Sequence, residues 1–600
     1  MRLPLLLLAA GFLLPAASSL RAADSFDVWA EELARRFVRL NPQLATRTQY
    51  LAAEEQDALD RDLALSGMYG ESYGAAQAKR LADFARAAMG ELARFPEAGL
   101  TPTQRTTAAI IRWRLDRQIT GEVFARNTFV FEQFGGLHLG LVHFLTATHP
   151  LRHRRDAENY LARLAVLSAR LDEAIAEARD AAAAGVLPPR FVLERVLGQL
   201  DNLLAGQASD HPLVAGFAQR LEALGGALSV EVRARFRAQA ENTVQDAVLP
   251  AFQRVQALLR EQLARATDDA GIWRLPRGDA SYAWALETLT TTALRPEEIH
   301  AVGLREVARI SAEMEGILIK LGYAGGTIDA RLEQLNAKLN PPAVPDPRPQ
   351  LLDKVAAVVR DAERRARASF DLLPRAPVEV RREPAFSEGS AAAHYSDPAP
   401  DGSLPGIYWI PLKDLGPRVT WLGVGLKSTA YHEAIPGHHF QVAIQQEADL
   451  PRCRKLGVFG ENSAYIEGWA LYAERLADEN GWYEDDLPGR LGYLNMQLFR
   501  AKRLVVDTGL HSKRWTRQQV IDYGFTPAET ERYIVWPGQA CSYMIGQLRL
   551  LELREKARAA LGAKFSIQAF HNEVLRGGSM PLEVLARELD AWVATVLSRN

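Results

Sequence analysis

The chain has 600 residues, of which 48% are hydrophobic, and its 71 basic residues nearly balance its 73 acidic ones. This composition is typical of a compact enzyme-sized protein, and the absence of long runs of one charge gives no indication of nucleic-acid binding. The two cysteines, Cys453 and Cys541, are far apart in the sequence, and spacing alone does not establish a disulfide between them.

The N-terminus has the pattern of a secretory signal peptide. One basic residue precedes a short apolar run, and small residues follow at Ala22 and Ala23. We expect residues 1–23 to be removed, with cleavage after Ser19 or Ala22 as alternatives. The apolar run is too short to span a membrane, and no later segment is continuously apolar for the ~20 residues that a spanning helix needs. These features predict a soluble protein that is exported, most simply to the periplasm, without a membrane span.

Most of the remaining chain shows helical periodicity. Leucine and isoleucine recur at intervals of three and four residues between Leu161 and Ile175, and again between Ile299 and Leu321. Glycines at 185 and 322 mark the ends of these helices. A Pro-rich stretch at 340–349 predicts a rigid connection between an N-terminal helical region, residues 24–340, and a second region, residues 350–600. The sequence therefore predicts a mainly α fold of two large helical lobes.

Two segments depart from this pattern. Residues 378–382 alternate apolar and polar side chains, and residues 406–411 are aromatic and β-branched, so both are predicted strands. An edge strand of such a small sheet can pair with an extended peptide, which makes Tyr408 a candidate substrate-binding residue. The alternative is a hairpin that only covers the helical core.

Residues 431–441, YHEAIPGHHFQ, place three imidazoles and a carboxylate in a short apolar segment. In the HExxH zinc motif two His side chains share a helix face and the Glu acts as general base, but here the second His position holds Pro436. Pro436 and Gly437 predict a helix break or bulge. Looping out about two residues would bring His438, rather than His439, to the second ligand position. The alternative is a helix that ends at Ile435, followed by a His-rich turn.

A third zinc ligand is expected downstream. Glu467 and Glu474 are seven residues apart on one helix face and interrupt apolar positions. We assign Glu467 as the ligand, since a carboxylate among apolar residues needs a partner. The alternative is that both are surface residues of an amphipathic helix.

These motifs resemble those of the domain-of-unknown-function 885 family, which are predicted bacterial zinc metallopeptidases. The family pattern is HExxPGHxxQ followed by EGWALYxE, and this sequence matches at His432, Glu433, Pro436, Gly437, His438, Gln441, Glu467, Gly468, Trp469, Ala470, Leu471, Tyr472 and Glu474. The resemblance spans nearly the whole mature chain. It implies a mainly helical fold, distantly similar to helical oligopeptidases and carboxypeptidases with a cleft between two halves, but no known substrate.

The segments DTGLH and PGQACSY also resemble the family and supply further candidates. Peptide hydrolysis passes through an oxyanion that needs hydrogen-bond donors beside the metal, for which we assign His511 and Tyr543. Asp507, four residues before His511, is expected to orient it. Arg532 is a candidate anchor for a substrate carboxylate.

The sequence thus predicts an exported peptidase with one zinc ion (Zn2+) held by His432, His438 and Glu467, and with Glu433 as general base. One alternative is a zinc amidohydrolase that acts on peptidoglycan stem peptides or acylated amino acids. Another is a non-enzymatic helical binding protein, against which the presence of Glu433 argues. Substrate length, endo- or exo-cleavage and oligomeric state stay open.

Overall fold

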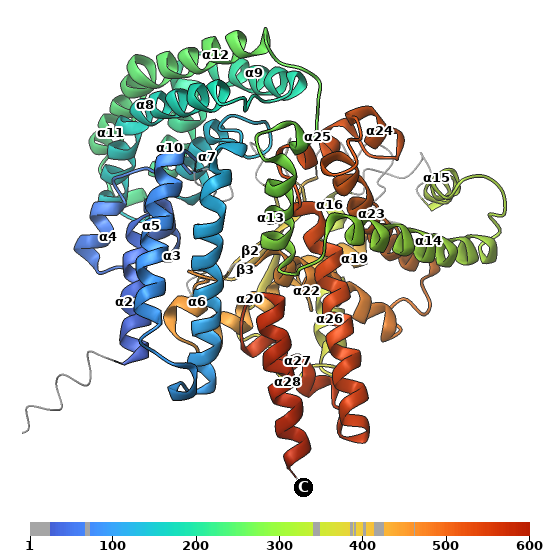
Figure 1. Cartoon of the computed structure of the whole chain (residues 1–600). Helices are drawn as coiled ribbons and strands as arrows, with labels where there is room; N and C mark the ends of the chain where they lie inside the picture. Colours follow the sequence, from blue (N-terminus) through green and yellow to red (C-terminus); the bar gives the residue numbers. More distant parts are fainter. Residues whose placement is uncertain are drawn as a thin grey trace, which may run out of the picture.

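The computed structural model describes residues 25–66, 73–339, 348–383, 388, 392–399, 402, 404–412, 425–460 and 462–599. The expected signal peptide and most of the Pro-rich connection at 340–349 lie outside these residues. The described chain is mainly α-helical with one small sheet, which confirms the predicted fold class (Figure 1).

The N-terminal helices stand side by side along one flank of the molecule, in blue in Figure 1. Thr101 begins the longest of them with a capping box, in which its hydroxyl accepts from the Gln104 amide and the Gln104 side chain accepts from the Thr101 amide. The helices of this flank are α2 (Phe26–Arg39), α3 (Pro42–Thr48), α4 (Ala53–Leu59), α5 (Ala75–Leu92) and α6 (Pro102–Gly121).

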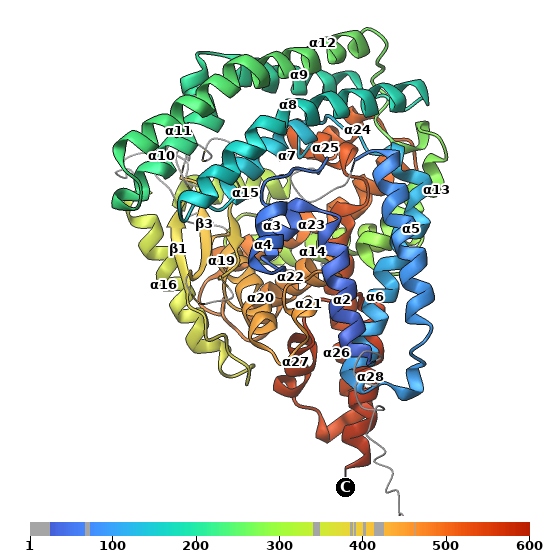
Figure 2. The same ribbon diagram turned by 90° about the vertical axis from the view of Figure 1, so that its left-hand side faces the viewer.

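A second group of helices forms a layer across the top of the molecule (Figure 2). Its helices are α7 (Leu137–His143), α8 (Arg154–Ala183), α9 (Arg190–Leu204), α10 (Pro212–Ala223), α11 (Val230–Thr243) and α12 (Leu249–Leu263). The apolar face predicted between Leu161 and Ile175 is buried in α8, and it forms the centre of a hydrophobic cluster that extends from Leu63 to Ala266.

The sheet has three strands in the order β1-β3-β2, namely β1 (Val378–Arg382), β2 (His394–Ser396) and β3 (Gly406–Ile410). β3 runs parallel to β1 and antiparallel to β2, and Tyr408 pairs with Val380 on one side and with Tyr395 on the other. The two strands predicted from the sequence are present, but they are parallel and do not form a hairpin. Tyr408 lies on the central strand and not on an edge that could pair with a peptide.

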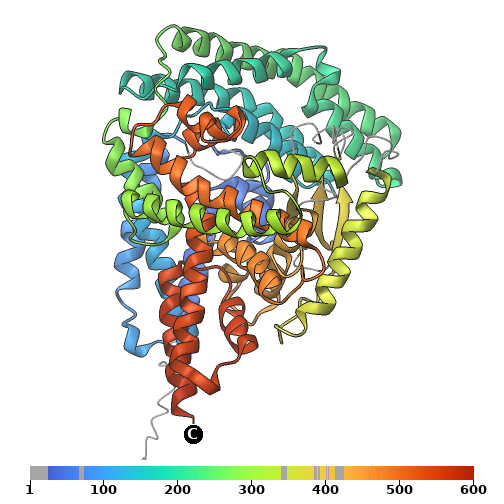
Figure 3. The same ribbon diagram turned by 90° about the vertical axis from the view of Figure 1, so that its right-hand side faces the viewer.

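The remaining helices build the other flank and the base of the molecule. Gly303 of α14 (Pro296–Lys320) lies against Leu504 and Val505 of α23 (Leu487–His511). These two helices therefore pack in close contact, as the light-green and orange helices in Figure 3 show. These helices are α13 (Gly278–Thr290), α14 (Pro296–Lys320), α15 (Ile328–Leu339), α16 (Arg348–Ala366), α19 (Leu426–Glu433), α20 (His438–Glu447), α21 (Arg452–Lys455), α22 (Ser463–Glu479), α23 (Leu487–His511), α24 (Arg517–Asp522), α25 (Pro527–Val535), α26 (Gln539–Leu561), α27 (Ile567–Arg576) and α28 (Leu582–Ser598).

The largest hydrophobic cluster joins both flanks. It contains residues of α2, α5 and α6 together with residues of α22, α26 and α28, so the N-terminal helices pack on the C-terminal ones in one continuous core. The Pro-rich stretch at 340–349 therefore does not separate two cores.

Cys453 and Cys541 are both buried and free.

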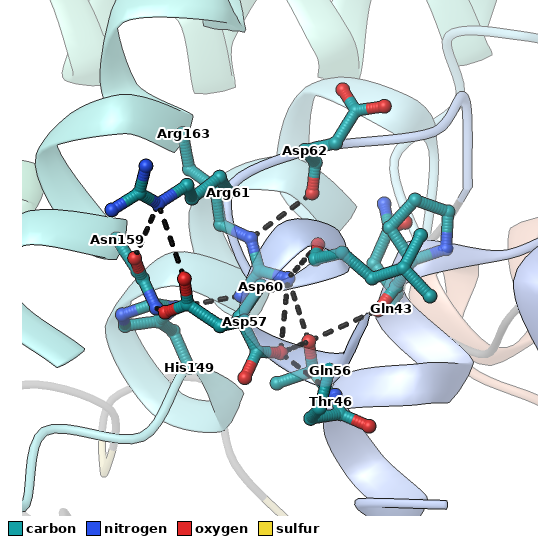
Figure 4. A network of polar contacts seen from close by, with 12 residues as sticks. Gln43, Thr46, Gln56, Asp57, Asp60, Arg61, Asp62, His149, Asn159 and Arg163 are labelled. Carbon is teal, nitrogen blue, oxygen red and sulfur yellow. Dashed lines mark hydrogen bonds and ion pairs between the residues drawn. The ribbon is translucent and has the colours of Figure 1, made fainter. Parts of the chain in front are cut away.

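A buried polar network ties the top layer to the N-terminal flank (Figure 4). Arg163 of α8 is fully buried and donates to the carbonyl oxygens of Leu59 and Asp62, to the Thr46 hydroxyl at 2.6 Å, and to Nδ1 of His149 at 2.7 Å. These bonds satisfy a charge that would otherwise be costly to bury.

Among the described residues, no helix is both long and apolar enough to cross a membrane.

Candidate metal centre

The chain changes direction between the first two candidate ligands. α19 ends at Glu433, α20 begins at His438, and residues 434–437 form a turn in which the Ile435–Pro436 peptide bond is cis. A Cβ on Gly437 would lie 1.8 Å from the carbonyl oxygen of His432, so only glycine fits this close approach. The expected two-residue bulge within one helix is therefore wrong. Four residues leave the helix, and a new helix starts at His438.

This turn brings three side chains together. One ring nitrogen each of His432 and His438 and one carboxylate oxygen of Glu467 lie within 4.8 Å of one another. Oε2 of Glu467 is 3.5 Å from Nε2 of His432 and 3.6 Å from Nε2 of His438. The two imidazole planes are nearly perpendicular, at 87°, with their centroids 4.8 Å apart. We call these three residues the metal cluster.

The metal cluster fits a divalent cation such as zinc. Two imidazole nitrogens and one carboxylate oxygen are a donor set of catalytic zinc sites, which keep a fourth position open. Oε2 of Glu467 is buried and has no hydrogen-bond partner in the described part of the chain. The side chains of His438 and Glu467 are still 12% and 21% exposed, so the cluster is accessible from outside.

Glu474 holds His432 in the orientation that a metal requires. Its Oε1 lies 2.8 Å from Nδ1 of His432, and its Oε2 accepts a hydrogen bond from Ser428. This contact fixes the proton on Nδ1 and directs Nε2 toward Glu467. Burial alone would lower the pKa of His432, but Glu467 and Glu474 raise it to about 10, since the carboxylates give the site an excess of negative charge.

Glu433 lies at the metal cluster with a free carboxylate. It is buried, and none of the described residues forms a hydrogen bond or ion pair with it. Burial raises the pKa of Glu433, while the neighbouring charges of His432 and His438 oppose the shift. A carboxylate in this setting is available to a water molecule beside the cluster.

His439 points away from the cluster, although it is adjacent to His438. Its Nε2 lies 3.0 Å from the carbonyl oxygen of Ala376 and its Nδ1 lies 3.1 Å from the Tyr395 hydroxyl. Since the Ala376 carbonyl can only accept, Nε2 carries the proton and Nδ1 accepts from Tyr395. His439 thus attaches α20 to the sheet.

Two candidate tyrosines, Tyr543 and Tyr408, have hydroxyl groups without a hydrogen bond to the described residues. Tyr543 lies on α26, where Gly546 packs against Gly468 so closely that a Cβ on Gly468 would be 2.6 Å from the Gly546 backbone. Tyr543 thus lies one helical turn from Gly546, which contacts the residue that follows the candidate ligand Glu467. Tyr408 is buried on β3, and burial followed by the charge of Glu433 raises its pKa well above the usual value. No hydrogen bond reaches either hydroxyl from the residues that the structure describes.

The oxyanion role expected of His511 does not fit its contacts. His511 is fully buried at the end of α23, where its Nδ1 accepts from the Ile272 amide and its Nε2 donates to the Tyr533 carbonyl, both at 3.0 Å. Both ring nitrogens are therefore occupied by backbone groups. Asp507 does not orient His511, because its carboxylate accepts from the Tyr282 hydroxyl and the Gly538 amide.

Arg532 is also engaged within the protein. Its Nη2 donates to the side-chain oxygen of Gln539 at 2.8 Å, and its Nη1 lies 3.4 Å from Glu529. A substrate carboxylate would have to compete with these partners. Sequence patterns gave no reason to single out Arg500 on α23, whose guanidinium lies 5.7 Å from the ring centre of Tyr543.

Comparison with known protein families shows the family to which this chain belongs. The model described as "Bacterial protein of unknown function (DUF885)" matches residues 67–589. The chain belongs to the DUF885 family. No curated protein matches this DUF885 chain.

Two solved structures share the fold. A "putative lipoprotein" from Colwellia psychrerythraea is 32% identical, with a TM-score of 0.84 over 95% of this chain and 100% of that one. A "putative lipoprotein of unknown function" from Shewanella oneidensis is 20% identical, with a TM-score of 0.68 over 94% of this chain and 99% of that one. The second similarity concerns the fold alone.

Proposed function

We propose that this DUF885 protein is a zinc-dependent peptidase that hydrolyses peptide bonds of oligopeptides. The observation that carries the proposal is the convergence of His432, His438 and Glu467, whose candidate ligand atoms lie within 4.8 Å of one another. One of these atoms, Oε2 of Glu467, is buried and has no hydrogen-bond partner among the residues that the structure describes. Three protein ligands and an accessible fourth position are typical of catalytic rather than structural zinc sites.

The side chains around the metal cluster have the properties that peptide hydrolysis needs. Zinc, when bound, supplies Lewis-acid chemistry and lowers the pKa of water toward ~7. Glu433, with its free buried carboxylate, accepts the proton of the attacking water and passes it to the leaving amine. Tyr543, whose hydroxyl has no partner among the described residues, donates a hydrogen bond to the developing oxyanion.

We further propose that the protein is exported, in the periplasm. The signal-peptide pattern of residues 1–23 supports this, as do the two similar structures described as lipoproteins. Fractionation of cells that express the tagged full-length chain tests the location. Recovery in the cytoplasmic fraction would contradict it.

The peptidase proposal is tested with purified protein after chelation and after reloading with one equivalent of zinc. We expect the reloaded protein to cleave members of a mixed peptide library, detected by mass spectrometry, and the chelated protein to be inactive. Cell-wall fragments and acylated amino acids in parallel reactions test the amidohydrolase alternative.

Glu433→Gln is the matched control, because it keeps the shape of the side chain but cannot accept a proton. It should retain zinc and lose turnover by a factor on the order of 10² or more. Stoichiometric zinc without hydrolysis of any peptide by the wild-type protein would sink the proposal. Near-normal turnover of Glu433→Gln would assign the general base to another group.

A further inference from the structure

A guanidinium on α23 is buried without a carboxylate partner among the described residues. Arg500 on α23 is only 9% exposed, and none of the described residues forms an ion pair with it. Its Nε has no hydrogen-bond partner within the described part of the chain, and its Nη1 contacts the Met496 sulfur at 3.7 Å. Burying an unpaired charge is costly, so such a group is suited to an anion that is not part of the chain.

Two further arginines, Arg503 and Arg532, share one carboxylate partner near Arg500. Arg503, one turn further along α23, pairs with Glu529 at 2.7 Å, and Arg532 approaches the same Glu529 oxygen at 3.4 Å. Nη1 of Arg503 and Nε of Arg532 are also buried without a hydrogen-bond partner. Among the described residues, Glu529 is thus the one carboxylate that pairs with any of these three arginines.

Arg500 is within electrostatic reach of the metal cluster. Its guanidinium carbon lies 5.7 Å from the ring centre of Tyr543, and Arg503 lies 4.8 Å from the same ring. The pKa of Arg500 is lowered by burial and then by the charge of Arg503, while the charges of Glu474 and Glu467 oppose this shift. Both carboxylates already have partners, since Glu474 accepts from His432 and Ser428 and Glu467 faces the two ligand imidazoles.

We propose that Arg500 binds a carboxylate group of the substrate and thereby selects the peptide bond that lies at the metal cluster. The proposal rests on the peptidase function proposed above. A guanidinium matches a carboxylate through two parallel hydrogen bonds. The carboxylate is either the free C-terminus of a short peptide, which directs cleavage close to that end, or an aspartate or glutamate side chain. Arg500 replaces Arg532 in this role, because Arg532 has Gln539 and Glu529 as partners.

The experiment measures binding by calorimetry to the zinc-loaded Glu433→Gln chain, so that no turnover is needed. The probes are acetyl-Ala-Ala-Phe with a free C-terminus, the same peptide as C-terminal amide, and acetyl-Ala-Glu-Phe amide. We expect one of the two carboxylate-bearing peptides to bind roughly 10- to 100-fold more tightly than the neutral amide, because a hydrogen bond between charged groups contributes that much to affinity. The peptide that binds more tightly shows whether the recognised carboxylate is the C-terminus or a side chain. Arg500→Met, added to Glu433→Gln, should abolish this difference and leave the affinity for the neutral amide unchanged.

Arg490→Met is the matched control. Arg490 lies on the same helix and is paired with Asp478 at 2.7 Å, so its loss should not change the preference for a carboxylate. Zinc content and thermal unfolding accompany each titration. Arg500 forms no ion pair with the described residues, so Arg500→Met leaves no buried carboxylate unpaired. The variant should therefore keep its zinc and unfold at the same or a higher temperature.

Three results would overturn the proposal: a parent protein that binds all three peptides equally, a preference that survives in Arg500→Met, or an Arg500→Met protein that has lost zinc or stability. The last result would mean that Arg500 compensates the charges of Glu467 and Glu474. Failure of the peptidase proposal is distinguishable, since absence of hydrolysis by the wild-type protein leaves these binding measurements intact.

Discussion

His438 and His439 are adjacent in the sequence, yet their rings contact different parts of the molecule. His438 faces Glu467 at the metal cluster, and His439 lies between Ala376 and Tyr395 at the sheet. Because α20 begins at His438, its first two residues point to different faces of that helix. The ligand assignment therefore depends on where the helix starts.

Alanine substitutions distinguish the two histidines. We expect His432→Ala, His438→Ala and Glu467→Ala each to lose stoichiometric zinc, whereas His439→Ala retains most of it and loses only some stability through its broken hydrogen bonds. Metal analysis of the four purified variants, with thermal unfolding as the check on folding, decides this. A metal-free His439→Ala protein that is still folded would overturn the assignment of His438.

The hydroxyl of Tyr543 offers a second test at the scale of one residue. Tyr543→Phe removes the hydroxyl and keeps the ring that contacts Arg500 and Arg503. If the hydroxyl stabilises the oxyanion, kcat falls by roughly 10²-fold with a much smaller change in KM, because that hydrogen bond strengthens as charge develops. Steady-state kinetics on the best peptide measures both constants. An unchanged kcat would leave Tyr543 as a packing residue.

At the scale of elements, the turn between α19 and α20 determines the geometry of the metal cluster. A Cβ on Gly437 would lie 1.8 Å from the His432 carbonyl oxygen and 2.4 Å from that of Tyr431. Both neighbours are backbone atoms, so relief of the clash requires the two helices to move apart. The close approach at Gly437 therefore determines how near the candidate ligands His432 and His438 lie to each other.

Gly437→Ala should therefore lower both stability and zinc affinity. We expect the free energy of unfolding to fall by more than about 1 kcal/mol, because the alanine Cβ would overlap backbone atoms and could not be accommodated without moving them. Gly316→Ala is the control, since Gly316 lies within α14 and a Cβ added there would meet no atom within 4 Å, so alanine should stabilise the helix by roughly 0.5–1 kcal/mol. Denaturant unfolding and zinc titration of both variants measure the effects. Equal behaviour of the two variants would contradict this account of the turn.

Local patterns predicted the elements and part of the site, whereas tertiary contacts determined the rest. Pro436 and Gly437 indicated the helix break, because proline and glycine act on the backbone at their own positions. The contacts that engage His511 could not be foreseen, because one of its partners, Ile272, is 239 residues away in the sequence. Arg500 could not be singled out either, since a missing ion pair is a property of the fold and not of the sequence.

At the scale of the whole molecule, the described residues form separate hydrophobic clusters. One lies within the top layer, and the largest joins the N-terminal and C-terminal flanks. Arg163 of α8 bonds to residues 46–62 of the N-terminal flank, and Asp60 lies 3.6 Å from its guanidinium. Burial lowers the pKa of Arg163 to about 10, so it remains charged at neutral pH.

Loss of Arg163 should weaken the attachment of the top layer. Arg163→Met keeps most of the side-chain volume but leaves Asp60 without a positive partner and His149 without its donor. We therefore expect the free energy of unfolding to fall by about 3–5 kcal/mol.

Arg155→Met on the same helix is the matched control. Arg155 reaches Asp57 in the same flank, but its side chain is half exposed, so its loss should cost at most about 1 kcal/mol. Denaturant unfolding compares the two variants, and zinc content per folded molecule should stay unchanged in both, because neither arginine contacts the metal cluster. A loss for Arg163→Met as small as that for Arg155→Met would mean that the buried guanidinium does not stabilise the attachment of the top layer.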